Sequence, residues 1–352
     1  MSTINELKWS YLTALVNEIK GPNTLLGGFF GNHVALPTED IEIDTVTGGR
    51  EIAPFVRRDG AAVMVSGLGS TFATVKAPNI RIKRAFTPTP LLFGRQPATT
   101  IFQSSASGIM SAVQAHIARD MTKMNNMIAN AEEYLSAMAL QGAISYSVTD
   151  QEVFTVTFPR NSDHNITLST FWNDGTPANV LFHEDIYRVK RLINEATGLS
   201  VTDAICGTEA AATFRKLVAG GHITSLDLRN VAMGSVTFNE QYRDNGALYM
   251  GTVDGINFWE YGRAADLNGV STAMVRAKYV EFIANSPAAE RTMYYGAIPD
   301  MDAFQGNLFQ AEKFSKSWME KDPSVQIALI HSRPLPVPRR PDATVSMKVV
   351  SG

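Results

Sequence analysis

The sequence predicts an α+β protein that is organised around one very long helix. Residues 104–141 contain no proline, and their apolar side chains recur at a mean step of (138 − 109)/8, or about 3.6 residues, which is the period of a helix. Residues 40–46 and 343–349 alternate apolar and polar side chains as strands do, and residues 183–310 mix both patterns. The apolar positions of the helix are Ile109, Val113, Ile117, Met121, Met124, Ile128, Ala131, Leu135 and Met138.

Both ends of this helix are marked. Ser104, Ser105 and Ser107 can accept hydrogen bonds from the first amides, and Gly142 stands just past the last turn. At about 1.5 Å per residue the helix would be about 57 Å long, which is too long for the interior of one compact domain. We therefore expect an elongated subunit with a large surface for other copies of itself. A coiled coil is disfavoured, because Asn125, Asn126 and Asn130 do not supply the charges that flank its seam.

Composition excludes several classes of protein. The chain has 352 residues, 45% of them hydrophobic, and can bury a sizeable core without staples. Its formal charge is −3, and no apolar run approaches the roughly 18 residues of a membrane span. The N-terminus lacks the pattern of a secretory signal, and Cys206 alone cannot form an internal disulfide. We therefore expect an intracellular protein that does not enter a membrane.

The N-terminal segment reads as a short arm. Residues 4–19 place apolar side chains on one helical face, and Gly21-Pro22 ends that helix. An apolar strip follows, and its glycines make it difficult for a monomer to bury. We predict that Phe29 and Phe30 contact a neighbouring subunit, and burial within the same subunit is an equally good alternative.

A basic segment follows an acidic strand. Residues 40–46 form a strand with one acidic face, whereas residues 50–95 hold eight basic and two acidic side chains, a net charge of +6. Residues 61–77 alternate around two glycines and predict a two-stranded ribbon, which would prefer an acidic neighbour. The run from Gly67 to Ser70 lacks the lysine of a phosphate loop, so we do not assign a nucleotide site there.

Beyond the long helix, strands precede a mixed unit. Residues 144–158 predict one strand and residues 166–172 its return partner, with a boundary at 173–177. The mixed unit is predicted as a helix ended by Gly198, a strand at 201–206 and a helix at 208–218. A hairpin around Asp254-Gly255 and terminal strands at 325–330 and 343–349, which flank an extended proline-rich run, complete the chain.

The sequence offers no constellation for catalysis or metal binding. Its six histidines are scattered, so we predict no metal site. His183, Glu184 and Asp185 cluster at a helix start, where acidic side chains favour the helix dipole. Cys206 follows an apolar strand and is best read as a buried structural thiol. We therefore predict no catalytic, cofactor-binding or metal-binding residue.

Several stretches resemble the lambda-type major capsid protein E family of tailed bacteriophages. They occur in the family's order and cover nearly the whole chain. The N-terminal stretches are Leu25-Leu26-Gly27-Gly28-Phe29-Phe30, Thr38-Glu39 to Asp44, and Arg50-Glu51-Ile52-Ala53-Pro54-Phe55-Val56. The C-terminal stretches are Tyr294-Tyr295-Gly296-Ala297-Ile298-Pro299-Asp300, Asp322-Pro323, His331-Ser332-Arg333-Pro334-Leu335-Pro336 and Pro341-Asp342-Ala343.

This resemblance implies the Hong Kong 97-type capsid fold. Its parts would be an N-terminal arm, an extended loop, a peripheral domain with a long spine helix and a β-sheet, and an α/β axial domain. On this chain the expected parts are the arm at 1–40, the loop at 41–98, the peripheral domain at 99–182, the axial domain at 183–310 and returning peripheral strands at 311–352.

The resemblance also implies a function. The protein would be the major capsid protein of a tailed bacteriophage, forming hexamers and pentamers of an icosahedral shell that encloses double-stranded DNA and contacts it non-specifically. Its partners would be a separate scaffolding protein, a portal protein and a decoration protein. It would occupy the virion, and the host cytoplasm during assembly.

The extended loop of such shells lies over a neighbouring subunit, which suggests intersubunit contacts for its basic residues. The residues concerned are Arg57, Arg58, Arg81, Lys83 and Arg84. Lys76 and Lys83 are the only lysines placed for a covalent crosslink, and we do not predict one. The alternatives are an encapsulin-like nanocompartment shell, which would hold protein cargo instead of DNA, and an α/β enzyme, which would be a compact monomer.

Overall fold

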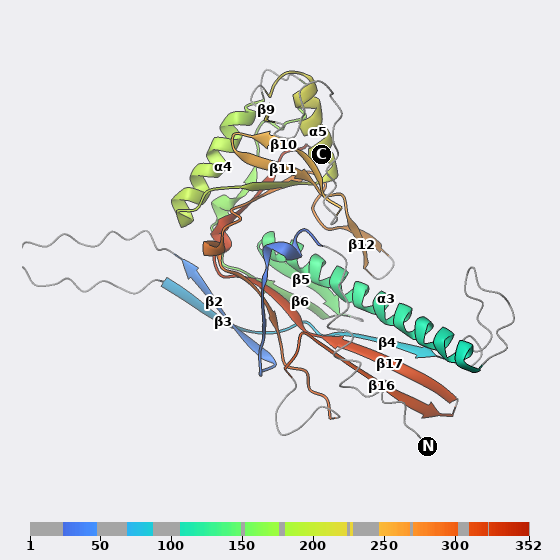
Figure 1. The fold of residues 1–352 in the computed structure, drawn as a ribbon. Helices are drawn as coiled ribbons and strands as arrows, with labels where there is room; N and C mark the ends of the chain where they lie inside the picture. The colour runs from blue at the N-terminus through green and yellow to red at the C-terminus, as the bar shows by residue number, and fades with distance from the viewer. Residues whose placement is uncertain are drawn as a thin grey trace, which may run out of the picture.

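The computed structural model describes residues 24–47, 69–86, 106–148, 152–175, 180–223, 226–227, 246–267, 270–301, 310–322 and 324–351. These residues form two packed units (Figure 1). The helix unit contains the long helix α3 and the strands beneath it, and the seven-stranded unit contains one mixed sheet with two helices. The two-stranded ribbon of β2 and β3 extends from the helix unit.

The predicted long helix is confirmed as α3, Ala106–Leu140. It ends at Gly142, whose φ of +100° is a conformation that favours glycine. The apolar stripe packs on two different sheets. Met121, Met124 and Ile128 contact Ala328 and Ile330 of one sheet, and the later turns pack against the other.

The first of these sheets has the order β16-β17-β4, with the antiparallel strands Lys313–Lys321, Ser324–Ser332 and Ile80–Phe86. The second has the order β1-β15-β18, with Asn32–Ala35, Arg291–Tyr295 and Pro334–Pro338. The proline-rich run is extended, as predicted, and it forms the edge strand β18. An edge tolerates proline because the missing amide is not needed for a further partner.

The ribbon differs from the prediction in its strands. It pairs β2, Asp40–Thr47, with β3, Gly69–Lys76, so that Asp40 lies opposite Lys76 and Thr47 opposite Gly69. The prediction placed both strands within 61–77, of which residues 61–68 lie outside the described residues. The acidic strand predicted at 40–46 is confirmed as β2, but the prediction did not include it in the ribbon. β4, which we assigned to the loop, instead pairs with β17 beneath α3.

The hairpin after α3 is shorter than predicted. β5, Ala143–Val148, pairs with β6, Glu152–Thr157, where the sequence had suggested one continuous strand. The polar residues at 149–151 interrupt the apolar alternation between them. The expected return strand at 166–172 is instead β7, Asn165–Thr167, which pairs in parallel with β19, Thr344–Lys348.

The seven-stranded unit has the strand order β7-β19-β14-β8-β11-β10-β9. Its helices are α4, Phe182–Thr197, and α5, Thr208–Ala219, and its remaining strands are β8, Asp203–Cys206, β9, Leu226–Asp227, β10, Leu248–Val253, β11, Ile256–Glu260, and β14, Tyr279–Ile283. Both helices cover one face, where Phe182 and Phe214 lie 5.9 Å apart between ring centroids. The opposite face, including Ile205 and Ile283, joins the core of the helix unit.

Local predictions in this unit are confirmed. Gly198 ends α4 in the left-handed conformation, with φ of +72°. Asp254 and Gly255 have φ values of +50° and +77° and connect β10 to β11, as expected for a tight hairpin turn. A separate hairpin of β12, Ala264–Leu267, and β13, Val270–Ala273, leads from this unit toward α3. Short 3₁₀ helices occur at Gly27–Phe29, Ser162–His164, Pro287–Ala289 and Pro341–Ala343.

Two strands on either side of the predicted C-terminal boundary of the α/β unit pair differently from the prediction. β15 falls inside the range 183–310 but pairs with β1 and β18 in the helix unit. β19 falls inside the range expected to return to the helix unit but pairs with β14 in the seven-stranded sheet. The buried side chains of Val345 and Met347 fill the core under α4 and α5, and sequence order alone does not reveal that destination.

Candidate assembly surfaces and joints

Residues 24–31, which we call the arm root, contain the apolar strip of Leu25, Leu26, Phe29 and Phe30. This strip is mostly buried within its own chain. Phe30 is fully buried, Leu25 and Leu26 are nearly so, and Phe29 is partly buried against the same core as the end of α3. The predicted contact of Phe30 with a neighbouring subunit is therefore wrong. Burial within the same subunit, which was the alternative, is what the structure contains.

The basic residues of β4 divide between its two faces. Ile80 and Ile82 pack toward α3, and Arg84 lies on the same face, where its Nε is 2.8 Å from Asp120 Oδ2 of α3. Arg81 and Lys83 lie on the opposite face and are exposed. Arg84 thus has a partner inside the chain, whereas Arg81 and Lys83 present their charges outward. Arg57 and Arg58 lie outside the described residues.

The root of the ribbon is acidic on its outer face. Ile41 and Ile43 of β2 are buried against the core, while Asp40 and Glu42 are exposed. Asp44 Oδ2 accepts a hydrogen bond from Arg339, at 3.2 Å, and Arg339 also donates to Glu290 Oε2, at 2.8 Å. The ribbon was expected to be basic, but its described part carries three acidic side chains on β2 and one lysine, Lys76, on β3.

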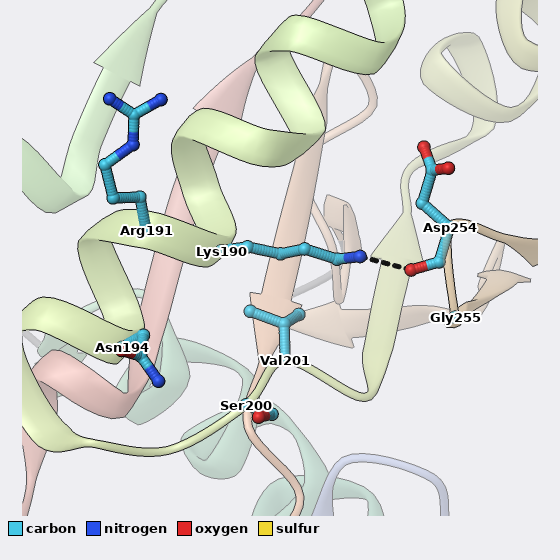
Figure 2. Close-up of a pocket in the computed structure, with 7 residues that line it drawn as sticks. All are labelled: Lys190, Arg191, Asn194, Ser200, Val201, Asp254 and Gly255. Carbon is cyan, nitrogen blue, oxygen red and sulfur yellow. Dashed lines mark hydrogen bonds between the residues drawn. The ribbon is translucent and has the colours of Figure 1, made fainter.

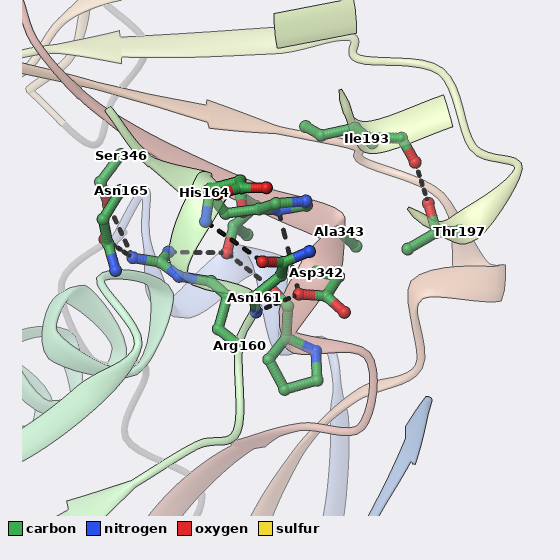
Figure 3. A network of polar contacts seen from close by, with 12 residues as sticks. Arg160, Asn161, His164, Asn165, Ile193, Thr197, Asp342, Ala343 and Ser346 are labelled. Atoms are coloured by element: carbon green, nitrogen blue, oxygen red, sulfur yellow. Dashed lines mark hydrogen bonds and ion pairs between the residues drawn. The ribbon is translucent and has the colours of Figure 1, made fainter. Parts of the chain in front are cut away.

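Arg160 connects the two units through several oxygen acceptors. Its guanidinium donates to the carbonyls of Leu140, at 3.3 Å, and Gln141, at 2.9 Å, which are the last acceptors of α3. It also donates to side-chain oxygens of β7 and β19, as Figure 3 shows for Asn165 and Ser346. Burial lowers the pKa of Arg160. One side chain therefore caps the long helix and ties it to the seven-stranded sheet.

Further buried charge surrounds this joint. Ser346 donates to Glu281 Oε2, and Arg276 donates to Glu281 Oε1 at 2.8 Å. Glu281 is only 3% exposed. Asn161 N and Asp342 Oδ1 are 2.8 Å apart and hold the turn before β7 against the turn before β19. The Nε atoms of Arg160 and Arg276 have no hydrogen-bond partner among the described residues, but the other contacts of this polar network fix one geometry between the elements that it joins.

Glu133 is a functional candidate that the sequence did not reveal. It lies on α3, fully buried, and accepts hydrogen bonds from the amides of Leu25, Leu26 and Gly27 and from the hydroxyl of Tyr261. Its position is off the predicted apolar stripe, so the helical period alone does not indicate that it is buried. One sequence signal could have indicated its burial. Ala129 and Ala137 lie one turn before and after Glu133, and such small residues allow another segment to approach the helix closely.

An electrostatic cluster lies beside the arm root. His33 Nδ1 is 3.3 Å from Glu312 Oε1, and this contact raises the pKa of His33 and lowers that of Glu312. Glu132 accepts a hydrogen bond from Tyr295, at 3.4 Å, and its burial raises its pKa. The cluster connects β1, α3, β15 and the start of β16. We had predicted no role for His33.

The histidine at the start of α4 makes structural contacts. Glu184 and Asp185 lie in the first helical turn, as predicted. His183 Nδ1 is 2.7 Å from Asp254 Oδ2, and Asp185 accepts from Trp172 Nε1 at 3.0 Å. Figure 2 shows Lys190 reaching the carbonyl of Asp254 across a groove of about 460 Å³. These contacts join α4 to the β10–β11 turn.

Cys206 is fully buried, and burial raises the pKa of its thiol. This matches the predicted structural thiol. Among the described residues, no group of three or more His, Cys, Asp and Glu side chains could hold a metal ion. In that same part of the chain, no helix is long and apolar enough to cross a membrane.

The chain matches the model of a protein family, described as phage major capsid protein E, over residues 8–349. No curated protein sequence matches it. Among solved structures it is similar to a prophage protein of Escherichia coli CFT073 that is described as a capsid protein. That similarity has a TM-score of 0.72 and 18% identity, and it covers 98% of this chain and 99% of the other.

Two further solved structures are similar at lower scores. A phage-related protein from Bordetella bronchiseptica RB50 has a TM-score of 0.50 and 11% identity, over 97% of each chain. The SrpI encapsulin from Synechococcus elongatus PCC 7942 has a TM-score of 0.48 and 9% identity, over 98% of this chain and 96% of the other. The similarity to the prophage protein confirms the expected Hong Kong 97-type fold.

Proposed function

The chain belongs to the phage major capsid protein E family, and we propose that many copies of it build the icosahedral shell of a tailed bacteriophage around double-stranded DNA. The observation that carries this proposal is the family match, which spans nearly the whole chain. A match of that length includes both units, the arm root and the ribbon. It therefore concerns nearly the whole of this chain rather than one shared domain.

The architecture is suited to such a role. The two units are joined through buried polar contacts at Arg160 and share a core, so the subunit body can act as one rigid piece. The ribbon extends from that body. A closed shell requires many moderate contacts of fixed geometry between identical subunits, and a rigid body with extended appendages supplies them. We propose hexamers and pentamers as the repeating groups.

We propose that the ribbon contacts the β4 face of a neighbouring subunit. The acidic side chains Asp40 and Glu42 are exposed on the ribbon, and the basic side chains Arg81 and Lys83 are exposed on β4. Opposite charges on two surfaces of one chain favour contact between copies. Arg57 and Arg58 remain proposed contacts, as does Phe29. Arg84 is better explained by its ion pair with Asp120.

The other proposed partners follow from the capsid role. They are a separate scaffolding protein, a portal protein, a decoration protein, and packaged DNA that is contacted without sequence specificity. The protein would reside in the virion after assembly in the host cytoplasm. We propose that it is not an enzyme and needs no cofactor, because closure of a shell requires only binding energy.

The test is electron microscopy with light scattering on the protein expressed alone and with the neighbouring reading frames of its genome. We expect closed icosahedral particles, or irregular shells that become regular with a scaffolding protein. Nucleic acid inside the particles would support the phage role, and protein cargo would support an encapsulin-like one. A discrete monomer or dimer under every condition would contradict the proposal.

Charge reversal tests the proposed contact surface. Arg81→Glu with Lys83→Glu should leave the circular dichroism spectrum and thermal midpoint unchanged, because both side chains are exposed, yet reduce the yield of closed shells at least tenfold. Adding Asp40→Lys and Glu42→Lys to the same chain should restore part of that yield. Normal shells from the first variant would exclude this pairing.

A further inference from the structure

The backbone of the arm root is held mainly by one side chain. Leu25 N and Leu26 N donate to Glu133 Oε1, at 3.1 and 2.9 Å, and Gly27 N donates to Oε2 at 2.6 Å. Three consecutive amides that converge on one anionic group form a compact anion-binding turn. The ladder of β1 begins only at Asn32, so these three amides find their partner on α3.

A second segment reaches the same carboxylate from the other unit. Tyr261, directly after β11, donates its hydroxyl to Glu133 Oε1 at 2.6 Å. Burial and the neighbouring Glu133 raise the pKa of this phenol, so it stays a donor. Glu133 therefore joins the arm root, the long helix and the seven-stranded unit at one point. The contacts with Leu25, Leu26 and Tyr261 are buried, so solvent does not readily replace them, and the contact with Gly27 is partly buried.

The local packing leaves little room for alternatives. A Cβ atom on Gly27 would lie 2.9 Å from Thr24 Oγ1 and 3.2 Å from Glu133 Oε2, so a larger residue would require the side chain of Thr24 or the carboxylate of Glu133 to shift. The adjacent Leu26 and Phe30 fill the shared core. Opening the turn would expose this apolar strip and remove three of the hydrogen bonds that the buried carboxylate of Glu133 accepts, which is unfavourable on both counts.

We propose that Glu133 is a positioning residue for assembly, which fixes the point where the N-terminal arm leaves the subunit body. This proposal rests on the proposed shell function. The turn at Leu25–Gly27 is already closed in the isolated subunit and stays closed in the shell. The place where Thr24 joins the subunit body is therefore the same before and after assembly.

Hydrogen exchange at single amides tests the closed turn directly. In the isolated wild-type subunit, the amides of Leu25, Leu26 and Gly27 should be as protected as those in the middle of α3, and assembly should change their exchange less than tenfold. Glu133→Ala should accelerate all three at least tenfold. Glu132→Gln is the matched control, because Glu132 contacts Tyr295 and not the arm root. This variant should leave the exchange of the three amides unchanged.

Two milder variants keep the test informative if Glu133→Ala fails to fold. Glu133→Gln retains one acceptor oxygen but places an amide nitrogen against a donor, and Gly27→Ala crowds the turn. Both should fold, as judged by an unchanged far-ultraviolet spectrum, and both should accelerate exchange at the three amides. Both should also lower the yield of closed shells, a readout that a purely local stabilising role would not move. Tyr261→Phe leaves the hydrogen bonds of the three amides to Glu133 in place, so it should accelerate their exchange less.

The outcomes separate this proposal from the shell function. Amides that exchange freely in the wild-type subunit, or become protected only on assembly, would overturn the fixed attachment point. Folded Glu133→Gln that assembles normally would overturn the positioning role. If the amides are protected and no protein forms shells under any condition, the closed turn stands and the proposed function fails.

Discussion

The described side chains of α3 divide into two stretches, residues 119–127 (the exposed half) and 128–140 (the covered half), which are buried in different ways. From Arg119 to Met127 the helix is exposed along one side, with Arg119, Lys123 and Met127 facing solvent and the opposite side resting on the β16-β17-β4 sheet. From Ile128 to Leu140 no residue is exposed. The first part is an amphipathic surface helix, and the side chains of the second are buried or only partly exposed.

This difference shows where the molecule is held together. The contacts between units cluster on the covered half: Glu133 binds the arm root and Tyr261, Arg263 donates to Asn130, and Gln141 Nε2 donates to the carbonyl of Met274 at 3.3 Å. Arg160 caps the same end. The described side chains of the first half pack against one sheet only. Substitutions should therefore be far more damaging near the end of α3 than near residues 119–127.

The largest effect is expected at Arg160. Arg160→Met would remove the cap of α3 and leave the carbonyls and hydroxyls that it binds without a donor. Losing one partner of a buried polar network should lower the free energy of unfolding by about 3 kcal/mol. Urea unfolding of the isolated subunit would measure it. Arg188→Met on the exposed face of α4 is the control and should change it by about 0.5 kcal/mol or less.

An equal loss in both variants would show that the joint contributes no more than a surface arginine. A loss confined to Arg160→Met would confirm that the contacts between the units matter for stability. The unfolding curve adds a further criterion. If the joint is what couples the two units, the variant should unfold with a lower slope in urea or in two steps, because the units would no longer melt together.

A pair of truncations within α3 sharpens the comparison between its halves. Leu135 is 4% exposed in the covered half, and Met127 is 49% exposed in the other. Leu135→Ala should lower the free energy of unfolding by about 3 kcal/mol, through lost burial and an unfilled cavity. Met127→Ala should change it by about 0.5 kcal/mol or less. Similar losses at both positions, measured by urea unfolding, would mean that the exposed half is also covered in the subunit.

The sequence predicted α3 well because its signals are local. The absence of proline, the period of 3.6 and Gly142 together predicted the helix to within two residues at each end. The β10–β11 hairpin and the end of α4 were predicted for the same reason, since Asp254-Gly255 and Gly198 adopt the backbone conformations that their residue types favour.

The errors concern pairing between distant segments. Nothing in residues 40–47 indicates that their partner is 69–76 rather than a closer strand, and β19 has the same alternation whether it joins one sheet or the other. Glu133 was missed for a related reason. Its role depends on Leu25–Gly27 and Tyr261, which lie more than 100 residues away in the sequence. Periodicity identifies a buried face but not the segment that covers it.

The smallest expected effect belongs to His33 and Glu312, a half-exposed pair at the edge of the covered half. The pKa of His33 is raised, so its contribution to stability is complete below its usual value of 6.5 and is lost as pH rises through the raised value. The pKa of Glu312 is lowered, so its contribution is present above its usual value of 4.5 and is lost as pH falls through the lowered value. The pair therefore stabilises the fold most between those two values.

Thermal midpoints of the wild type and of His33→Gln across pH 4 to 9 would test this pair. The midpoint of the wild type should exceed that of the variant most near pH 5.5, and the two midpoints should agree above pH 8. The largest difference should correspond to about 0.5 kcal/mol in the free energy of unfolding, because solvent screens both side chains. Burial is the main cause of the raised pKa of Glu132 and acts in both proteins, so most of its contribution cancels in the difference. A difference that grows as pH rises would mean that neutral His33 is the stabilising form, and that its contact with Glu312 is not an ion pair. The expected change in the free energy of unfolding is several times smaller than the loss expected for Leu135→Ala, because the contact of His33 with Glu312 is half exposed whereas Leu135 is buried.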